Sequence, residues 1–107
     1  MHGGDTERQD TLRITIQERP ESTLLKLAGR VAGPWLAELR KAWRNLLPSL
    51  GSKVFAVDLE DVTFANLEGR RLLHDIHRET GCRFLANTPM TRDIAYQATH
   101  GTGRKEL

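Results

Sequence analysis

The sequence has one cysteine, few aromatic residues and no apolar run long enough to cross a membrane. The single thiol, Cys82, cannot form an internal disulfide and has no second cysteine with which to bind a metal. It precedes a short apolar stretch, so we expect an inert thiol in the core. The first residues also lack the apolar core of a secretory signal. We therefore expect a cytoplasmic protein that is not inserted in a membrane.

Basic residues do not gather in one region of the chain. The formal net charge is +2, aromatic residues make up 6%, and lysines and arginines alternate with acids. Nucleic-acid-binding domains concentrate positive charge in a patch or stripe, so no nucleic-acid partner is expected. Phosphate-binding loops of the GxxxxGK and GxGxxG types are absent. No catalytic set of serine, histidine and aspartate can be assembled, and we expect neither an enzyme nor a cofactor.

The chain has 107 residues, of which 38% are hydrophobic and 28% charged. This is enough to bury the core of one domain. Residues 1–10 and 101–107 are polar, contain glycine and show no hydrophobic period. We expect them to be flexible ends flanking a single domain over residues 11–100.

Hydrophobic periodicity predicts the first elements. Alternation predicts strands over residues 12–17 and 23–28, joined by a turn at residues 19–22 as a hairpin, with the second strand ending at Gly29. After Pro34, apolar residues recur at steps of three and four and predict an amphipathic helix that stops near Pro48. Trp43 is expected in the core, and Trp35 is expected to be partly exposed at a partner surface.

Residues 54–69 are the most informative stretch. An apolar run that ends in Asp58 is typical of a strand buried on both faces, and it predicts a central strand over residues 53–59. A short acidic turn is expected after it, in a loop over residues 60–66. Asn66 can cap a helix that ends at Gly81. A short strand over residues 82–86 and a helix over residues 88–99 follow. The sequence predicts an α/β fold of order β-β-α-β-α-β-α, with a mixed sheet of about four strands and parallel strands joined by helices.

Several motifs in this order resemble the STAS domain, the sulfate transporter and anti-sigma factor antagonist family. They are LKLAG at residues 25–29, VFAVDL at residues 54–59, Val62-Thr63-Phe64 with Gly69, and GCRFL at residues 81–85. The resemblance covers about residues 12–99. It implies a single STAS-like domain that acts by protein–protein contact.

The chain departs from this family at one informative position. In signalling members, the serine before the glycine of an Asp-Ser-Ser-Gly-type turn is phosphorylated by a partner kinase, which abolishes partner binding. The matching residues here are Asn66, Leu67, Glu68 and Gly69, so Glu68 occupies the phospho-acceptor position and no acceptor remains. A carboxylate in the first turn of a helix is favoured by ~0.3–1 kcal/mol. It carries less charge than the about −1.5 to −2 of phosphoserine, so loss of switching is favoured over mimicry.

The resemblance implies a partner-binding surface after the third strand. Its expected partner is an anti-sigma factor or another kinase-like protein. Two alternatives remain: a regulatory subunit of a transporter, and a domain whose cleft above the strand ends binds a small ligand such as a nucleotide or lipid. The candidate partner-binding residues are Asp58, Thr63, Asn66, Leu67, Glu68 and Gly69.

The helix predicted after the third strand carries two histidines that are three residues apart. His74 and His77 would need a third ligand to hold a metal, and the nearby sequence offers none. We interpret them as a solvated pair and expect no metal site.

Overall fold

The computed structural model describes residues 11–101, which form one four-stranded sheet and three helices. Strand order is β1-β2-β3-β4, with β1 antiparallel to β2 and the other pairs parallel. The predicted α/β class, hairpin and element order are confirmed. Apart from Gly101, the predicted flexible ends lie outside the described residues. The elements are β1 (Leu12–Glu18), β2 (Ser22–Val31), α2 (Trp35–Leu50), β3 (Val54–Ala65), α3 (Leu67–Thr80), β4 (Arg83–Leu85) and α4 (Pro89–His100).

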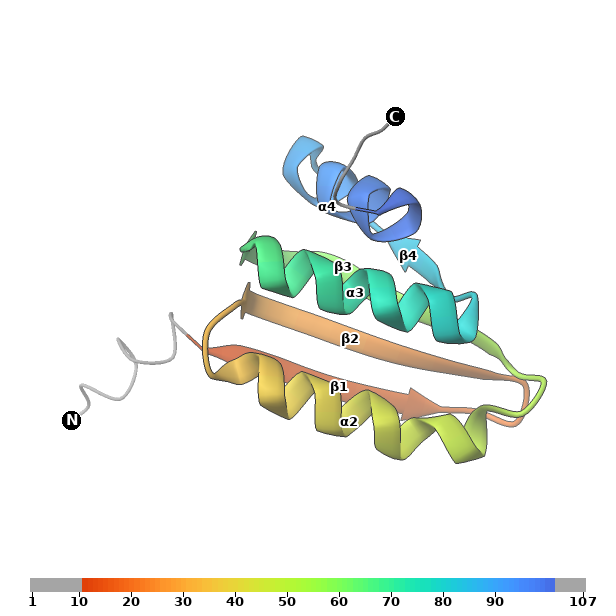
Figure 1. The fold of residues 1–107 in the computed structure, drawn as a ribbon. Helices are drawn as coiled ribbons and strands as arrows, with labels where there is room; N and C mark the ends of the chain where they lie inside the picture. The colour runs from red at the N-terminus through yellow and green to blue at the C-terminus, as the bar shows by residue number, and fades with distance from the viewer. Residues whose placement is uncertain (1–10, 102–107) are drawn as a thin grey trace.

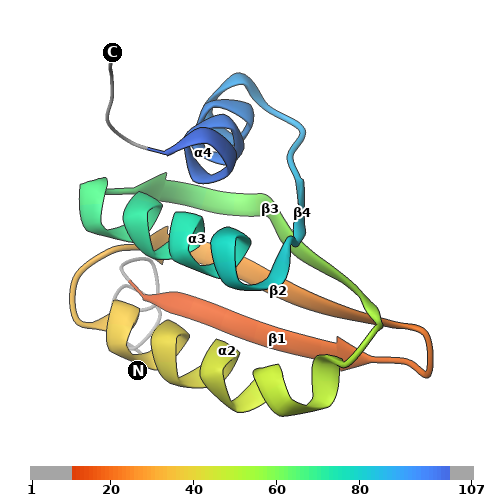
Figure 2. The ribbon, with the colours of Figure 1, turned by 45° about the vertical axis from the view of Figure 1, so that its right-hand side comes forward.

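The helices lie on one side of the sheet. α2 and α3 run side by side across that face, and α4 packs against α3 and β3 near the β4 edge (Figures 1 and 2). The core fills the space between sheet and helices, where Trp43 is buried as expected and Trp35 is half-buried. Side chains fully buried there include Leu25, Leu27, Leu39, Val57, Leu59, Leu73 and Ile76.

Two predicted ends were wrong, both by about two residues. α2 continues through Pro48 to Leu50, because the Leu50 side chain is buried in the core and its carbonyl accepts a hydrogen bond from Lys53 N at 2.8 Å. β2 continues past Gly29 to Val31. Gly29 has φ +98° and a side chain there would overlap the Thr11 carbonyl, so this glycine serves a close strand contact within the sheet.

The predicted loop over residues 60–66, with its acidic turn, was wrong, because β3 continues through residue 59 to Ala65. Its pairing with β2 shifts register twice, and each shift gives β3 one extra residue, as in a β-bulge. Buried positions on β3 therefore change from steps of two, at Phe55, Val57 and Leu59, to steps of three, at Val62 and Ala65. The irregular spacing of apolar residues after Leu59 therefore reflects the two register shifts within β3 and not the end of the strand.

The first turn of α3 touches the backbone of β2. A Cβ atom on Gly69 would overlap the carbonyl oxygen of Val31 and lie 3.0 Å from its Cγ1 atom. Asn66 N also donates to that carbonyl at 3.4 Å. Only glycine lets the helix approach the strand this closely, and the contact fixes where α3 begins.

We expect Gly69→Ala to lower the free energy of unfolding by roughly 1–3 kcal/mol, because the methyl group overpacks against backbone. The direction is diagnostic, since alanine is otherwise favoured over glycine inside a helix by about 1 kcal/mol. Urea unfolding followed by circular dichroism measures the change. Asp75→Ala, at an exposed position of the same helix, serves as control and should stay within about 0.5 kcal/mol of the parent. A Gly69→Ala protein as stable as the parent would contradict the close contact.

Candidate functional site

The junction between β3 and α3, residues 65–69, is called here the α3 corner. Asn66 has an extended backbone and its Oδ1 atom accepts from Gly69 N at 2.8 Å, which confirms the predicted helix cap. The Asn66 carbonyl accepts from Arg70 N at 2.9 Å. Together with the Gly69 contact, these bonds hold the corner in one conformation.

Leu67 and Glu68 project from this rigid corner. Leu67 is 50% exposed at the start of α3. Glu68 is exposed in the first turn of α3, where the helix dipole favours its negative charge. These two neighbouring candidate residues therefore both lie at the surface.

The other two candidates lie on β3. Thr63 is exposed two residues before the end of the strand, close in sequence to the α3 corner. Asp58 lies mid-strand, roughly 20 Å from the corner at the usual rise of a strand, and is only 8% exposed. Its Oδ1 atom accepts from Glu60 N at 2.8 Å, next to the first register shift. The structure therefore separates Asp58 from the corner and gives it a local role in shaping β3.

Arg30 and Phe64 were not among the candidate partner-binding residues, yet both lie beside the corner, and so does Trp35, which was predicted to be partly exposed at a partner surface. Arg30 and Phe64 are a cross-strand pair, and the Arg30 guanidinium carbon lies 4.3 Å from the centroid of the Phe64 ring. Phe64 is 39% exposed and lies on the face of β3 opposite to that of the buried Ala65. The only sequence signal was an aromatic residue in a stretch of broken alternation.

Two hollows flank the segment of residues 32–34. The first, called the helix hollow, has a volume of about 460 Å³ and lies between α2 and α3, with Arg40, Glu68, Arg71 and Asp75 among its lining residues. The second, called the strand hollow, has about 470 Å³. It is lined by Arg30, Ala32, Gly33, Pro34, Trp35, Phe64 and Asn66.

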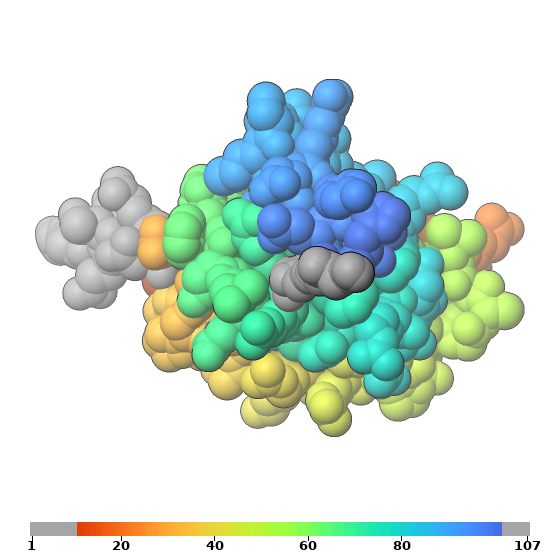
Figure 3. All heavy atoms as spheres, turned by 45° about the horizontal axis from the view of Figure 1, so that its top comes forward, coloured from red at the N-terminus to blue at the C-terminus, as the bar shows by residue number. Residues whose placement is uncertain are grey.

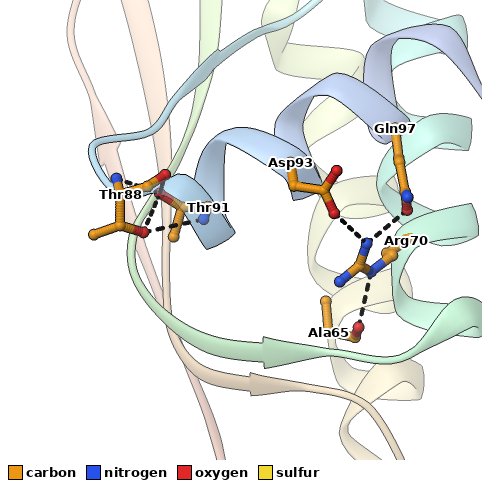
Figure 4. Close-up of polar contacts among 6 residues, drawn as sticks. All are labelled: Ala65, Arg70, Thr88, Thr91, Asp93 and Gln97. Carbon is orange, nitrogen blue, oxygen red and sulfur yellow. Dashed lines mark hydrogen bonds and ion pairs between the residues drawn. The ribbon is translucent and has the colours of Figure 1, made fainter.

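Arg70 joins the corner to α4 (Figure 4). Its Nε atom donates to the Ala65 carbonyl at 2.9 Å, and its Nη1 atom donates to Asp93 Oδ2 at 3.1 Å and to Gln97 Oε1 at 2.7 Å. α4 itself begins with a capping box between Thr88 and Thr91 (Figure 4). In the space-filling view α4 lies over α3, while the start of α3 stays at the surface (Figure 3). Arg70 thus positions α4 without covering the corner.

The two histidines of α3 are not the solvated pair that was predicted. His74 Nδ1 lies 2.8 Å from the Ala98 carbonyl, and His77 Nδ1 lies 2.9 Å from the Cys82 carbonyl. Both rings are half-buried, because α4 and the segment before β4 pack against this side of α3. Each histidine helps to dock a neighbouring segment. Within residues 11–101 no group of three histidine, cysteine, aspartate or glutamate side chains is placed to hold a metal.

Cys82 is buried, as expected from the sequence. Burial raises the pKa of its thiol from 9.0 to about 11. The thiol therefore stays protonated near neutral pH, which is the unreactive form.

Comparison with known proteins supports the architecture. No family model and no curated protein matches the sequence. Among solved structures, the fold is similar to an anti-sigma factor antagonist from Mycobacterium paratuberculosis, with a TM-score of 0.61 over 78% of this chain and 74% of that chain, at 16% identity. The chain has a STAS-like fold. Among residues 11–101, no helix of the STAS-like domain is both long and apolar enough to span a membrane.

We expect Arg70→Met to lower the free energy of unfolding of the STAS-like domain by roughly 1–3 kcal/mol, because three acceptors lose a charged donor. Amide hydrogen exchange in α4 should accelerate more than in β2. Asp93→Asn is the matched control: the Asp93 side chain is 58% exposed, so its loss should cost less than about 1 kcal/mol. Equal effects of the two substitutions would show that the ion pair, and not the contacts to Ala65 and Gln97, positions α4.

The Cys82 pKa gives a pH prediction. Above pH 9.0 the unfolded chain releases the thiol proton while the folded domain retains it to about pH 11. The folded state then binds more protons, so stability falls as pH rises through this window, by at most about 1.4 kcal/mol per pH unit. Urea unfolding at pH 8 to 11 should show a steeper loss for the parent than for Cys82→Ala. Parallel pH profiles of the two proteins would contradict the raised pKa.

Proposed function

We propose that this protein is a non-catalytic regulatory module that acts by protein–protein contact through the α3 corner. The observation that carries the proposal is the half-exposed Leu67 on a corner held by the Asn66 cap, the Gly69 contact and the Arg70 bonds. An apolar side chain presented on a rigid support binds a partner at little cost in conformational entropy. The similarity in fold to an anti-sigma factor antagonist supports the same class of function.

Binding at this corner is expected to be constitutive. Glu68 stands where the family resemblance places a phosphorylated serine, and it carries a permanent single negative charge. Its exposed carboxylate in the first turn of α3 supports a contact role and leaves no hydroxyl to modify at that position. The partner is expected to tolerate or pair with this fixed charge.

Site-specific photo-crosslinking in cells of the source organism tests the surface and identifies the partner. A benzophenone amino acid at position 67 should trap one partner, and mass spectrometry of the adduct would show whether it is an anti-sigma-type protein or a transporter subunit. The control position is Tyr96 on α4, which is 63% exposed and outside the corner. Adducts that are identical from both positions would argue against the α3 corner.

We expect Leu67→Ala to weaken binding of the purified partner by at least about 1 kcal/mol, as for a buried interface anchor. Glu68→Ser should also change the affinity. Stability of both variants should stay within about 0.5 kcal/mol of the parent, because both side chains are exposed. Isothermal titration calorimetry measures the affinities, with Met90→Ala as a matched control because Met90 is 39% exposed on α4. If Leu67→Ala and Glu68→Ser bind like the parent, the surface is wrongly assigned.

A further inference from the structure

The strand hollow combines apolar walls with hydrogen-bond donors. Pro34, Trp35 and Phe64 supply apolar surface, while Arg30 and Asn66 supply donors. None of its seven lining residues is acidic. The helix hollow on the other side of residues 32–34 differs, because two acids there balance two arginines. The strand hollow is therefore the more positive of the two.

Arg30 is held in place without being neutralised. Its guanidinium group stacks on Phe64, its cross-strand neighbour, at 4.3 Å. The ring attracts the cation that lies over its face, and this contact uses none of the N–H donors of the guanidinium group. Lys26 and Arg70 pair with Asp61 and Asp93, whereas Arg30 forms no ion pair with any residue from 11 to 101. A carboxylate from outside this part of the chain would find a prepositioned guanidinium.

Asn66 adds a second donor. Its Oδ1 atom is used by Gly69 N at 2.8 Å, which orients the side-chain amide. No acceptor among the described residues takes the two protons of its Nδ2 atom. The half-buried amide lines the same hollow as Arg30, so both donors serve one small region.

We infer that the strand hollow binds an acidic segment of a partner protein. In this arrangement an aromatic or large aliphatic side chain packs on Trp35 and Phe64, and a neighbouring aspartate or glutamate accepts hydrogen bonds from Arg30. The assignment rests on charge complementarity, since the hollow offers a cation and an amide donor without an acid, and on the exposed apolar walls. The inference depends on the proposed function only in assuming that the partner is a protein. It concerns a surface that does not include Leu67 or Glu68.

Three capped peptides test the inference against the full ¹⁵N-labelled chain. The first carries phenylalanine between two aspartates, the second replaces the aspartates by lysines, and the third replaces the phenylalanine by alanine. In an NMR titration, the first peptide should shift the Trp35 indole and Asn66 side-chain amide signals. The dissociation constant from these shifts should be at least tenfold lower for the first peptide than for the other two. The indole signal of Trp43, which is buried in the core, should not move and serves as internal reference.

Substitutions define the contacts. Arg30→Glu should lower the affinity for the acidic peptide at least tenfold and raise the affinity for the lysine peptide. Phe64→Ala should also lower the affinity for the acidic peptide. The control is Arg83→Glu, at an exposed position of β4, with less than a twofold effect. If Arg30→Glu does not fold, Arg30→Gln and a titration from low to high salt replace it, because a charge contact at the surface weakens as salt rises.

Several results would overturn the inference. The first is equal affinity for the aspartate and lysine peptides, and the second is an effect of Arg83→Glu on peptide affinity as large as that of Arg30→Glu. The third is affinity for free 3-phenylpropionate as high as that for the acidic peptide, which would indicate a small-molecule site. These outcomes leave the proposed function intact if Leu67→Ala still weakens the natural partner. Conversely, the acidic peptide could bind as expected while Leu67→Ala leaves binding of the natural partner unchanged. That result would contradict the proposed role of the α3 corner and support the one inferred for the strand hollow.

Discussion

The close contact between Gly69 and the Val31 carbonyl determines how the rest of the surface is arranged. It brings the first turn of α3 against the end of β2, and it leaves no room for a side chain between them. Residues 32–34 follow this contact directly and connect β2 to α2, and Gly33 and Pro34 line both the helix hollow and the strand hollow. Glu68 lines the first hollow and Asn66 the second, so the contact that positions the α3 corner also positions one wall of each hollow.

The two register shifts of β3 are the second constraint. Each shift of one residue reverses the face that the following side chains occupy. The first shift therefore buries Val62, and the second returns Phe64 to the outward face and Ala65 to the core, the faces that strict alternation from Val57 would also give them. The two shifts together determine that Arg30 is the cross-strand partner of Phe64, and the first of them lies beside the bond between Asp58 and Glu60 N.

Local chemistry explains which features the sequence could predict. The hairpin follows from alternation in β1 and β2, and the start and end of α3 follow from the Asn66 cap and Gly81 in the left-handed conformation. The pairing of Arg30 with Phe64 could not be predicted, because it depends on a register that only pairing with β2 determines. The bonds of His74 and His77 likewise depend on where α4 and Cys82 pack. Leu67 and Glu68 could be placed in the first turn of α3 from the sequence, because position after a cap is a local property.

On the proposed binding surface, charged and apolar groups have different roles. Arginines and acids balance in the helix hollow, so electrostatics there contribute little net attraction. The exposed Leu67 of the neighbouring α3 corner is the proposed apolar contact. The strand hollow has an uncompensated guanidinium beside aromatic walls. Charge complementarity mainly sets orientation and association rate, whereas buried apolar anchors set affinity. If a partner covers both hollows as proposed, one acidic group facing Arg30 would orient it, and the carboxylate of Glu68 in the helix hollow would repel a second acid.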